Sequence, residues 1–199
     1  IPSYEECSED PDKFTSAYMT FYHNCDPITA NGLCQKHGNR YLIQNPPQRD
    51  PTTEELDKIY SLDYENKVHP SCLAEGHVKA ADTIKNSVTT HRGCYGGCNF
   101  CAIAVHQGRR VISRSEDSII EEIERFANEP GFNGIIYDLG GPTANMYGIE
   151  CKKKMEKGAC EDKQCLFPSV CNSLPLDHSR QIRLLKRARN VPKVRKVFV

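Results

Sequence analysis

The sequence has 199 residues, and its 26 Lys and Arg residues balance 26 Asp and Glu residues, so the formal net charge is zero. This balance gives no reason to expect a nucleic acid or an anionic membrane as a partner. No apolar run is long enough to cross a bilayer, and residues 1–20 are acidic and lack the apolar core of a signal peptide, so we expect a cytoplasmic protein.

The 11 cysteines are an odd number, which argues against a closed disulfide framework. In a chain without a secretion signal, clustered cysteines indicate metal or redox chemistry. The chain also has two features of a fragment, because it begins with Ile1 and ends on the apolar run Val194–Val199, which is typical of a buried strand.

Residues 1–82 are expected to form an irregular arm of helical and extended segments that packs on the core. Apolar residues at helical spacing predict a helix over about residues 13–24. The prolines of Gln44–Pro51 require an extended chain, because each proline fixes its own φ and restricts its predecessor. Thr53, followed by two glutamates, predicts the start of a short helix that ends near Leu62.

Residues 83–199 alternate strand and helix patterns, with a cysteine-bearing insertion over residues 148–174. The elements expected in chain order are a strand over 84–90, an extended piece over 111–113, a helix over 115–129, a strand over 132–141, a helix over 177–189 and a last strand over 194–199. Ile182, Leu185 and Ala188 should face the core from the later helix. This alternation predicts an α/β fold with a parallel sheet.

Three cysteines, Cys94, Cys98 and Cys101, lie in a glycine-rich loop directly after the first strand of this array. Structural zinc and structural [4Fe–4S] sites take four ligands, so His91 or His106 would have to complete either one. Three thiolates alone fit a cubane that leaves one iron free of protein and open to a substrate. The glycines allow the backbone to wrap around a large inorganic ligand and to turn N–H groups toward its negative charge.

This loop and its flanks resemble a known superfamily. The spacing C-x3-C-x-aromatic-C of Cys94, Cys98, Phe100 and Cys101, after a strand and at the head of a βα array, is similar to the radical SAM signature. Further segments, among them QKHGNRYLIQNPP, IIYDLGGPTANMYG and CLFPSVC, resemble the YgiQ-type family of uncharacterised radical SAM proteins. The resemblance covers nearly the whole chain and assigns no substrate.

The resemblance implies a role for each residue of the loop. Cys94, Cys98 and Cys101 would hold a [4Fe–4S] cluster, and its open iron would bind the amino and carboxylate groups of S-adenosylmethionine. Phe100 would lie near the adenine. A reductant such as flavodoxin or ferredoxin would drive cleavage to a 5′-deoxyadenosyl radical, which would abstract hydrogen from an unknown substrate. The residues that would bind the methionine amino group are Gly140, Gly141, Pro142 and Thr143.

The resemblance also implies a partial (β/α) barrel of the radical SAM type over residues 83–199. A barrel of this type needs more βα units than the sequence shows, so we expect it to be truncated and to have no turnover alone. Because the cysteine loop and the Gly-Gly turn follow successive strands, they should be neighbours in space.

Two arginines after the cysteine loop, Arg109 and Arg114, are candidates for bidentate binding of a carboxylate. The alternative is a solvated basic loop.

Four further cysteines lie in the insertion at the spacing C-x8-C-x4-C-x5-C, namely Cys151, Cys160, Cys165 and Cys171. So many thiols in a polar segment are difficult to explain as core packing. The alternatives are an auxiliary [4Fe–4S] cluster, a structural zinc and free thiols on a mobile loop. The spacing is not that of a zinc knuckle, which favours iron–sulfur.

Other function classes remain open at this point. The cations of Arg180–Lys196 fall on the solvent face and C-terminal end of a predicted helix, without interleaved aromatic residues, so nucleic acid is not indicated. The rival readings of the whole chain are a non-enzymatic zinc-binding interaction module and a simple electron-transfer iron–sulfur protein. The latter would need His91 or His106 as a fourth ligand.

Overall fold

A computed structural model describes residues 1–143, 145–161 and 164–199. The chain groups into two compact units that interleave along the sequence. The predicted mixed α/β class is confirmed, and the described residues form no closed barrel. The partial barrel and the division between residues 82 and 83 stay predictions. The first unit comprises Ile1–Asp50, Gly93–Arg110 and Glu150–Pro175, and the second comprises Pro51–Arg92, Val111–Ile149 and Leu176–Val199.

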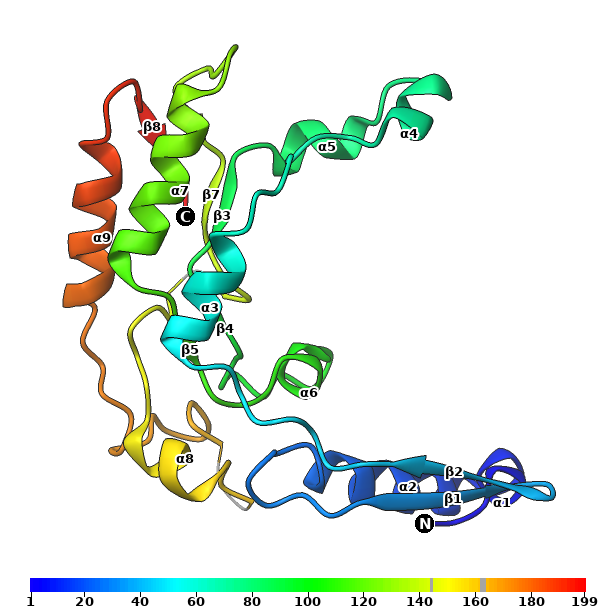
Figure 1. The fold of residues 1–199 in the computed structure, drawn as a ribbon. Coiled ribbons are helices and arrows are strands. Elements are labelled where there is room, and N and C mark those ends of the chain that lie inside the picture. Colours follow the sequence, from blue (N-terminus) through cyan, green and yellow to red (C-terminus); the bar gives the residue numbers. More distant parts are fainter. Residues whose placement is uncertain (144, 162–163) are drawn as a thin grey trace. The chain divides into compact units, whose positions relative to one another are not determined.

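The first unit begins with two helices and a hairpin (Figure 1). Ser3 forms a capping box at the start of α1 (Tyr4–Glu9), and Asp10 caps α2 (Pro11–His23), which confirms the helix predicted there. β1 (Leu33–His37) and β2 (Arg40–Gln44) pair in antiparallel fashion, and the sequence analysis did not predict this hairpin. The later segments of the unit contribute the short helices α6 (Ile103–His106) and α8 (Lys152–Lys157).

Parallel strand pairs form the centre of the second unit. β3 (Ser87–Thr89) pairs with β7 (Asp138–Gly140), and β6 (Ile135–Ile136) pairs with β8 (Lys196–Val197). The parallel arrangement that the alternation of elements predicts is therefore confirmed for these strands. One pair departs from it, because β4 (His91–Arg92) and β5 (Ile112–Ser113) are antiparallel.

Helices cover these strands in the second unit. Thr52, one residue before the predicted position, caps α3 (Thr53–Tyr60). Two short helices, α4 (Pro70–Ala74) and α5 (Lys79–Ile84), precede β3. α7 (Glu116–Asn128) begins after the predicted cap Ser115, and α9 (Ser179–Arg189) lies beside it (Figure 1). The buried core joins residues of both long helices to residues of the strands, including Ile119, Ile123, Leu184, Val88, Ile136 and Leu139.

No helix among the residues that the structure describes is both long enough and apolar enough to cross a membrane.

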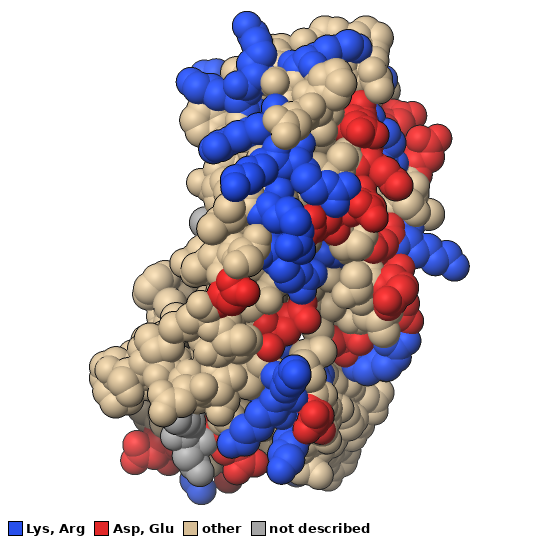
Figure 2. All heavy atoms as spheres, turned by 90° about the vertical axis from the view of Figure 1, so that its left-hand side faces the viewer, with Lys and Arg blue, Asp and Glu red and all other residues tan. Residues whose placement is uncertain are grey.

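One prediction about α9 is wrong. Ile182 is 52% exposed, whereas Leu184 and Ala188 are buried. The cause is hydrophobic burial, because Leu184 and Ala188 belong to the core and Leu185 packs against it as predicted, which turns Ile182 out of the buried face. Arginines of α9, among them Arg183, also form ion pairs with acidic residues in the first turn of α7, among them Glu116, but pairs this exposed contribute little to stability. Figure 2 shows Lys and Arg side chains gathered along this helix, with acidic side chains beside them.

A buried guanidinium connects three elements of the second unit. Arg114 is fully buried, forms an ion pair with Glu122 of α7 and donates to the carbonyl oxygen of Thr89 at 2.8 Å. Its guanidinium carbon lies 4.1 Å from the centre of the Tyr60 ring in α3. The carboxylate that pairs with Arg114 is therefore the Glu122 side chain of the same unit.

A buried imidazole lies at the end of β7. His91 is fully buried, its Nδ1 lies 2.9 Å from Thr90 Oγ1, and its Nε2 has no hydrogen-bond partner among the described residues. A Cβ atom at Gly141 would lie at most 2.7 Å from three atoms of the ring, so only glycine fits there. Burial disfavours the charged imidazolium and lowers the pKa of His91 from 6.5 to about 4.

We expect Glu122→Gln to lower the free energy of unfolding by about 3 kcal/mol, because it leaves the buried Arg114 charge without its counter-ion. Urea unfolding followed by circular dichroism measures this change. The matched control is Glu121→Gln on the exposed side of the same helix, with an expected effect below about 0.5 kcal/mol. Equal effects of the two substitutions would show that the ion pair does not stabilise the fold.

His91 predicts a pH dependence of stability. Between pH 6.5 and about 4 the unfolded chain binds a proton at His91 that the folded protein does not, so stability falls as pH falls through this window. We expect His91→Phe to remove about 3 kcal/mol of the stability loss between pH 7 and pH 4. His106→Phe, at an exposed histidine, should leave the loss unchanged. Identical pH profiles for the wild type and His91→Phe would contradict the assignment.

Candidate metal and cofactor site

The cysteine loop leaves β4 and is closed by backbone contacts within the first unit. Cys94 N donates to the carbonyl oxygen of Gly108 at 3.0 Å, and Cys101 N donates to that of Cys98 at 3.1 Å. Gly97 has a φ of 65°, a conformation that glycine adopts at little cost. The loop is thus a closed turn that carries all three predicted ligands and leads into α6.

Two of the three sulfurs face the same point of the loop. A Cβ atom at Gly96 would lie 3.3 Å from Cys94 Sγ and 3.6 Å from Cys98 Sγ, and Gly96 N donates to Cys94 Sγ at 3.3 Å. Burial raises the pKa of the Cys94 thiol, and the nearby Cys98 and Cys101 sulfurs add to the shift. A metal would therefore have to displace a thiol proton at Cys94.

The donor set of the loop is three thiols. No three His, Cys, Asp or Glu side chains in the described part of the chain are placed to hold one metal ion together. In a cubane each thiolate binds a different iron, so the sulfurs need to surround the cluster without meeting at one point. The three thiols lie on one glycine-rich loop, with Cys94 buried, Cys101 half-buried and Cys98 exposed.

A cavity of about 570 Å³ adjoins the cysteine loop, within the usual range for a cofactor or small ligand. One wall is the loop, including Cys98 and Cys101, and the opposite wall is α2. Phe100, the predicted adenine contact, lines this cavity and is 93% exposed. The residues that α2 contributes are Tyr18, Met19, Phe21 and Tyr22.

The α2 wall is the part of the site that sequence reasoning missed. Residues 18–22 and 97–105 are far apart in the chain, and no local pattern in either segment records their contact. The guanidinium carbon of Arg109 lies 5.9 Å from the centre of the Tyr22 ring in α2, and the binding of a carboxylate by Arg109 stays a prediction. The arm thus supplies aromatic surface to the cavity at the cysteine loop.

The Gly-Gly motif lies in the second unit, where β7 ends. β7 pairs directly with β3, which confirms that the strands preceding the two motifs are neighbours, whereas the proximity of the motifs themselves stays a prediction. The carbonyl oxygen of Gly140 accepts a hydrogen bond from Thr90 N at 2.6 Å, and this bond holds Gly140 in place. The hydroxyl oxygen of Thr143 is buried and has no hydrogen-bond partner among the described residues, so it is available to a ligand.

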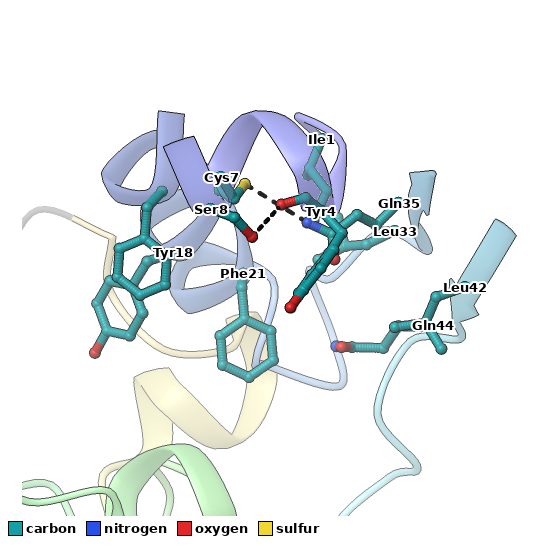
Figure 3. A pocket seen from close by; sticks show the side chains of 12 residues that line it. Ile1, Tyr4, Cys7, Ser8, Tyr18, Phe21, Leu33, Gln35, Leu42 and Gln44 are labelled. Atoms are coloured by element: carbon teal, nitrogen blue, oxygen red, sulfur yellow. Dashed lines mark hydrogen bonds between the residues drawn. The ribbon is translucent and has the colours of Figure 1, made fainter. Parts of the chain in front are cut away.

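The first unit also contains an apolar cavity of about 510 Å³ between α1, α2 and the hairpin. Figure 3 shows aromatic and aliphatic side chains around it, with Tyr4, Phe21 and Gln44 directed toward its interior. None of the cysteines at positions 94, 98 and 101 lines this cavity, but Tyr18 and Phe21 of α2 line both it and the cavity at the cysteine loop.

The chain was compared with known proteins. Residues 1–87 match the protein-family model described as Radical SAM N-terminal. The whole chain is 56% identical over 199 residues to UPF0313 protein FN0734 of Fusobacterium nucleatum and covers 35% of that protein. It is 46% identical over 199 residues to UPF0313 protein CLJ_B0249 of Clostridium botulinum. It is 47% identical over 198 residues to a UPF0313 protein of Methanosarcina mazei. Both alignments cover all of this chain and 31% of the relative.

The chain therefore spans about a third of the length of the curated relatives it matches. None of these names carries the narrower YgiQ-type description, which stays a resemblance. The Radical SAM N-terminal match and the alignment of the whole chain with UPF0313 proteins together support the resemblance to the radical SAM superfamily.

Proposed function

We propose that the whole protein is a radical SAM enzyme in which Cys94, Cys98 and Cys101 hold a [4Fe–4S] cluster with one iron open to S-adenosylmethionine. The observation that carries this proposal is the position of the cysteine loop. It gathers three thiols around one glycine-rich turn, at the wall of a cavity large enough for a cofactor. The Radical SAM N-terminal match independently favours the same chemistry.

The cofactor pair of this superfamily supplies a 5′-deoxyadenosyl radical after one-electron reduction, for which we propose flavodoxin or ferredoxin as donor. The chain's own residues would bind the cluster and shield the cofactor site from water. The Gly96 N–H already donates to Cys94 Sγ and would stabilise the thiolate. The aromatic side chains of α2 would exclude water from the cavity, which protects a reactive radical from side reactions.

In this proposal the Gly-Gly motif also has a cofactor-binding role. We assign to Gly140, Gly141, Pro142 and Thr143 the binding of the methionine amino group, as the family resemblance implies. Two features of the second unit support the assignment. The Thr143 hydroxyl lacks a partner among the described residues, and the imidazole of His91 allows only glycine at position 141.

Anaerobic reconstitution of the full-length protein with iron and sulfide tests the cluster. Cys94→Ala should bind about four fewer irons per chain than the wild type, and the EPR change that S-adenosylmethionine causes in the reduced wild type should be absent. Cys34→Ala, at an exposed cysteine outside the loop, should match the wild type. Zinc in place of iron, with no response to S-adenosylmethionine, would leave a zinc-binding interaction module as the better reading.

The wall formed by α2 gives a separate prediction. Tyr22→Ala should weaken binding of S-adenosylmethionine about tenfold and speed loss of the cluster's visible absorbance in air, because it removes an aromatic side chain from the cavity. Tyr41→Ala is the matched control, since Tyr41 lies on β2, is 65% exposed and does not line this cavity. Equal affinity and equal air stability in the two variants would exclude α2 from the cofactor site.

A further inference from the structure

The insertion in the first unit brings its cysteines to one place. Cys151, Cys160, Cys165 and Cys171 line the same cavity, whose volume is about 50 Å³. Cys151 and Cys160 flank α8, and a hydrogen bond of 2.8 Å from Cys171 N to the carbonyl oxygen of Cys165 closes the loop that carries the other pair. None of these cysteines forms a disulfide.

The loop around this cavity buries one thiol and exposes apolar side chains. Cys165 is 6% exposed, whereas Leu166, Phe167 and Val170 are 42%, 69% and 44% exposed. A loop with its apolar side chains in solvent gains little stability from hydrophobic burial, so another interaction must hold it. Metal–thiolate bonds are the usual device for ordering such a short, polar segment.

A buried cation lines the same cavity. Lys154 of α8 is 3% exposed, and its Nζ donates to the carbonyl oxygen of Arg109 at 3.1 Å. No carboxylate among the described residues forms an ion pair with it. Four thiolates around Zn²⁺ or a [4Fe–4S]²⁺ core carry a net charge of about −2, which a buried ammonium would balance.

We infer that Cys151, Cys160, Cys165 and Cys171 form a second metal centre, held by four thiolates, whose negative charge Lys154 balances. Binding releases the thiol protons and leaves the four sulfurs as ligands. A single zinc ion requires all its ligands about 2.3 Å from one point, and no three such side chains of the described residues are so placed. Sulfurs that surround a cavity without converging fit an iron–sulfur cluster better.

The test uses the full-length protein with Cys94, Cys98 and Cys101 all replaced by Ala, so its result does not depend on the first site. After anaerobic reconstitution this background should hold about four irons and four sulfides per chain. Adding Cys160→Ser and Cys171→Ser should remove them, whereas Cys34→Ser and Cys72→Ser, at exposed cysteines, should not. About one zinc per chain, lost through the same two substitutions, would support the thiolate centre with a single ion in place of the cluster.

Two results would overturn the inference. One is a background protein that binds neither iron nor zinc while its far-UV circular dichroism matches the wild type. The other comes from lysine variants in the same background, in which Cys94, Cys98 and Cys101 are Ala, because the charge of Lys154 also acts on Cys94. Lys154→Met should release metal from this centre to a chelator about tenfold faster, because the balancing charge is lost. Lys157→Met, at an exposed lysine of the same helix that does not line the cavity, should not, and equal rates would show that Lys154 balances no anionic centre.

Discussion

The buried guanidinium of Arg114 is the contact on which the second unit depends. It joins the end of β3 through the carbonyl oxygen of Thr89, α7 through Glu122 and α3 through the ring of Tyr60. A charge without solvent is tolerated only where its partners are fixed in place, so this contact sets the arrangement of a strand and two helices. The chain leaves that strand toward the cysteine loop, past the buried imidazole of His91.

The first unit is organised by different chemistry. Its described residues bury few large apolar side chains, and its best-defined later segments carry cysteines near cavities. Around Cys94 the backbone of a glycine-rich turn approaches the sulfur closely, and a second loop buries the Cys165 thiol while its apolar side chains lie in solvent. Both features are explained if metal–sulfur bonds supply the stability that hydrophobic burial provides in the second unit.

Local sequence patterns predicted the features that depend on residues close together in the chain. The cap Ser115 and the spacing of apolar residues after it defined α7 and its buried face, and the alternation of elements predicted the parallel pairing of β3 with β7. Contacts between residues far apart in the chain left no local pattern from which they could be predicted. Ile182 was placed inward because its spacing was suitable, but the burial of Leu184 and Ala188 turns it into solvent. The contact of Tyr22 with the cavity at the cysteine loop has no counterpart in either local sequence.

The most direct test of the central claim is electron–nuclear double resonance on the reduced full-length protein with isotope-labelled S-adenosylmethionine. Label in the amino nitrogen and carboxylate oxygen reports whether these groups bind the iron that Cys94, Cys98 and Cys101 leave open. The account predicts hyperfine coupling of both labels to the cluster, lost when Cys98 is replaced by Ala. A cluster that forms in the wild type but couples to neither label would contradict it.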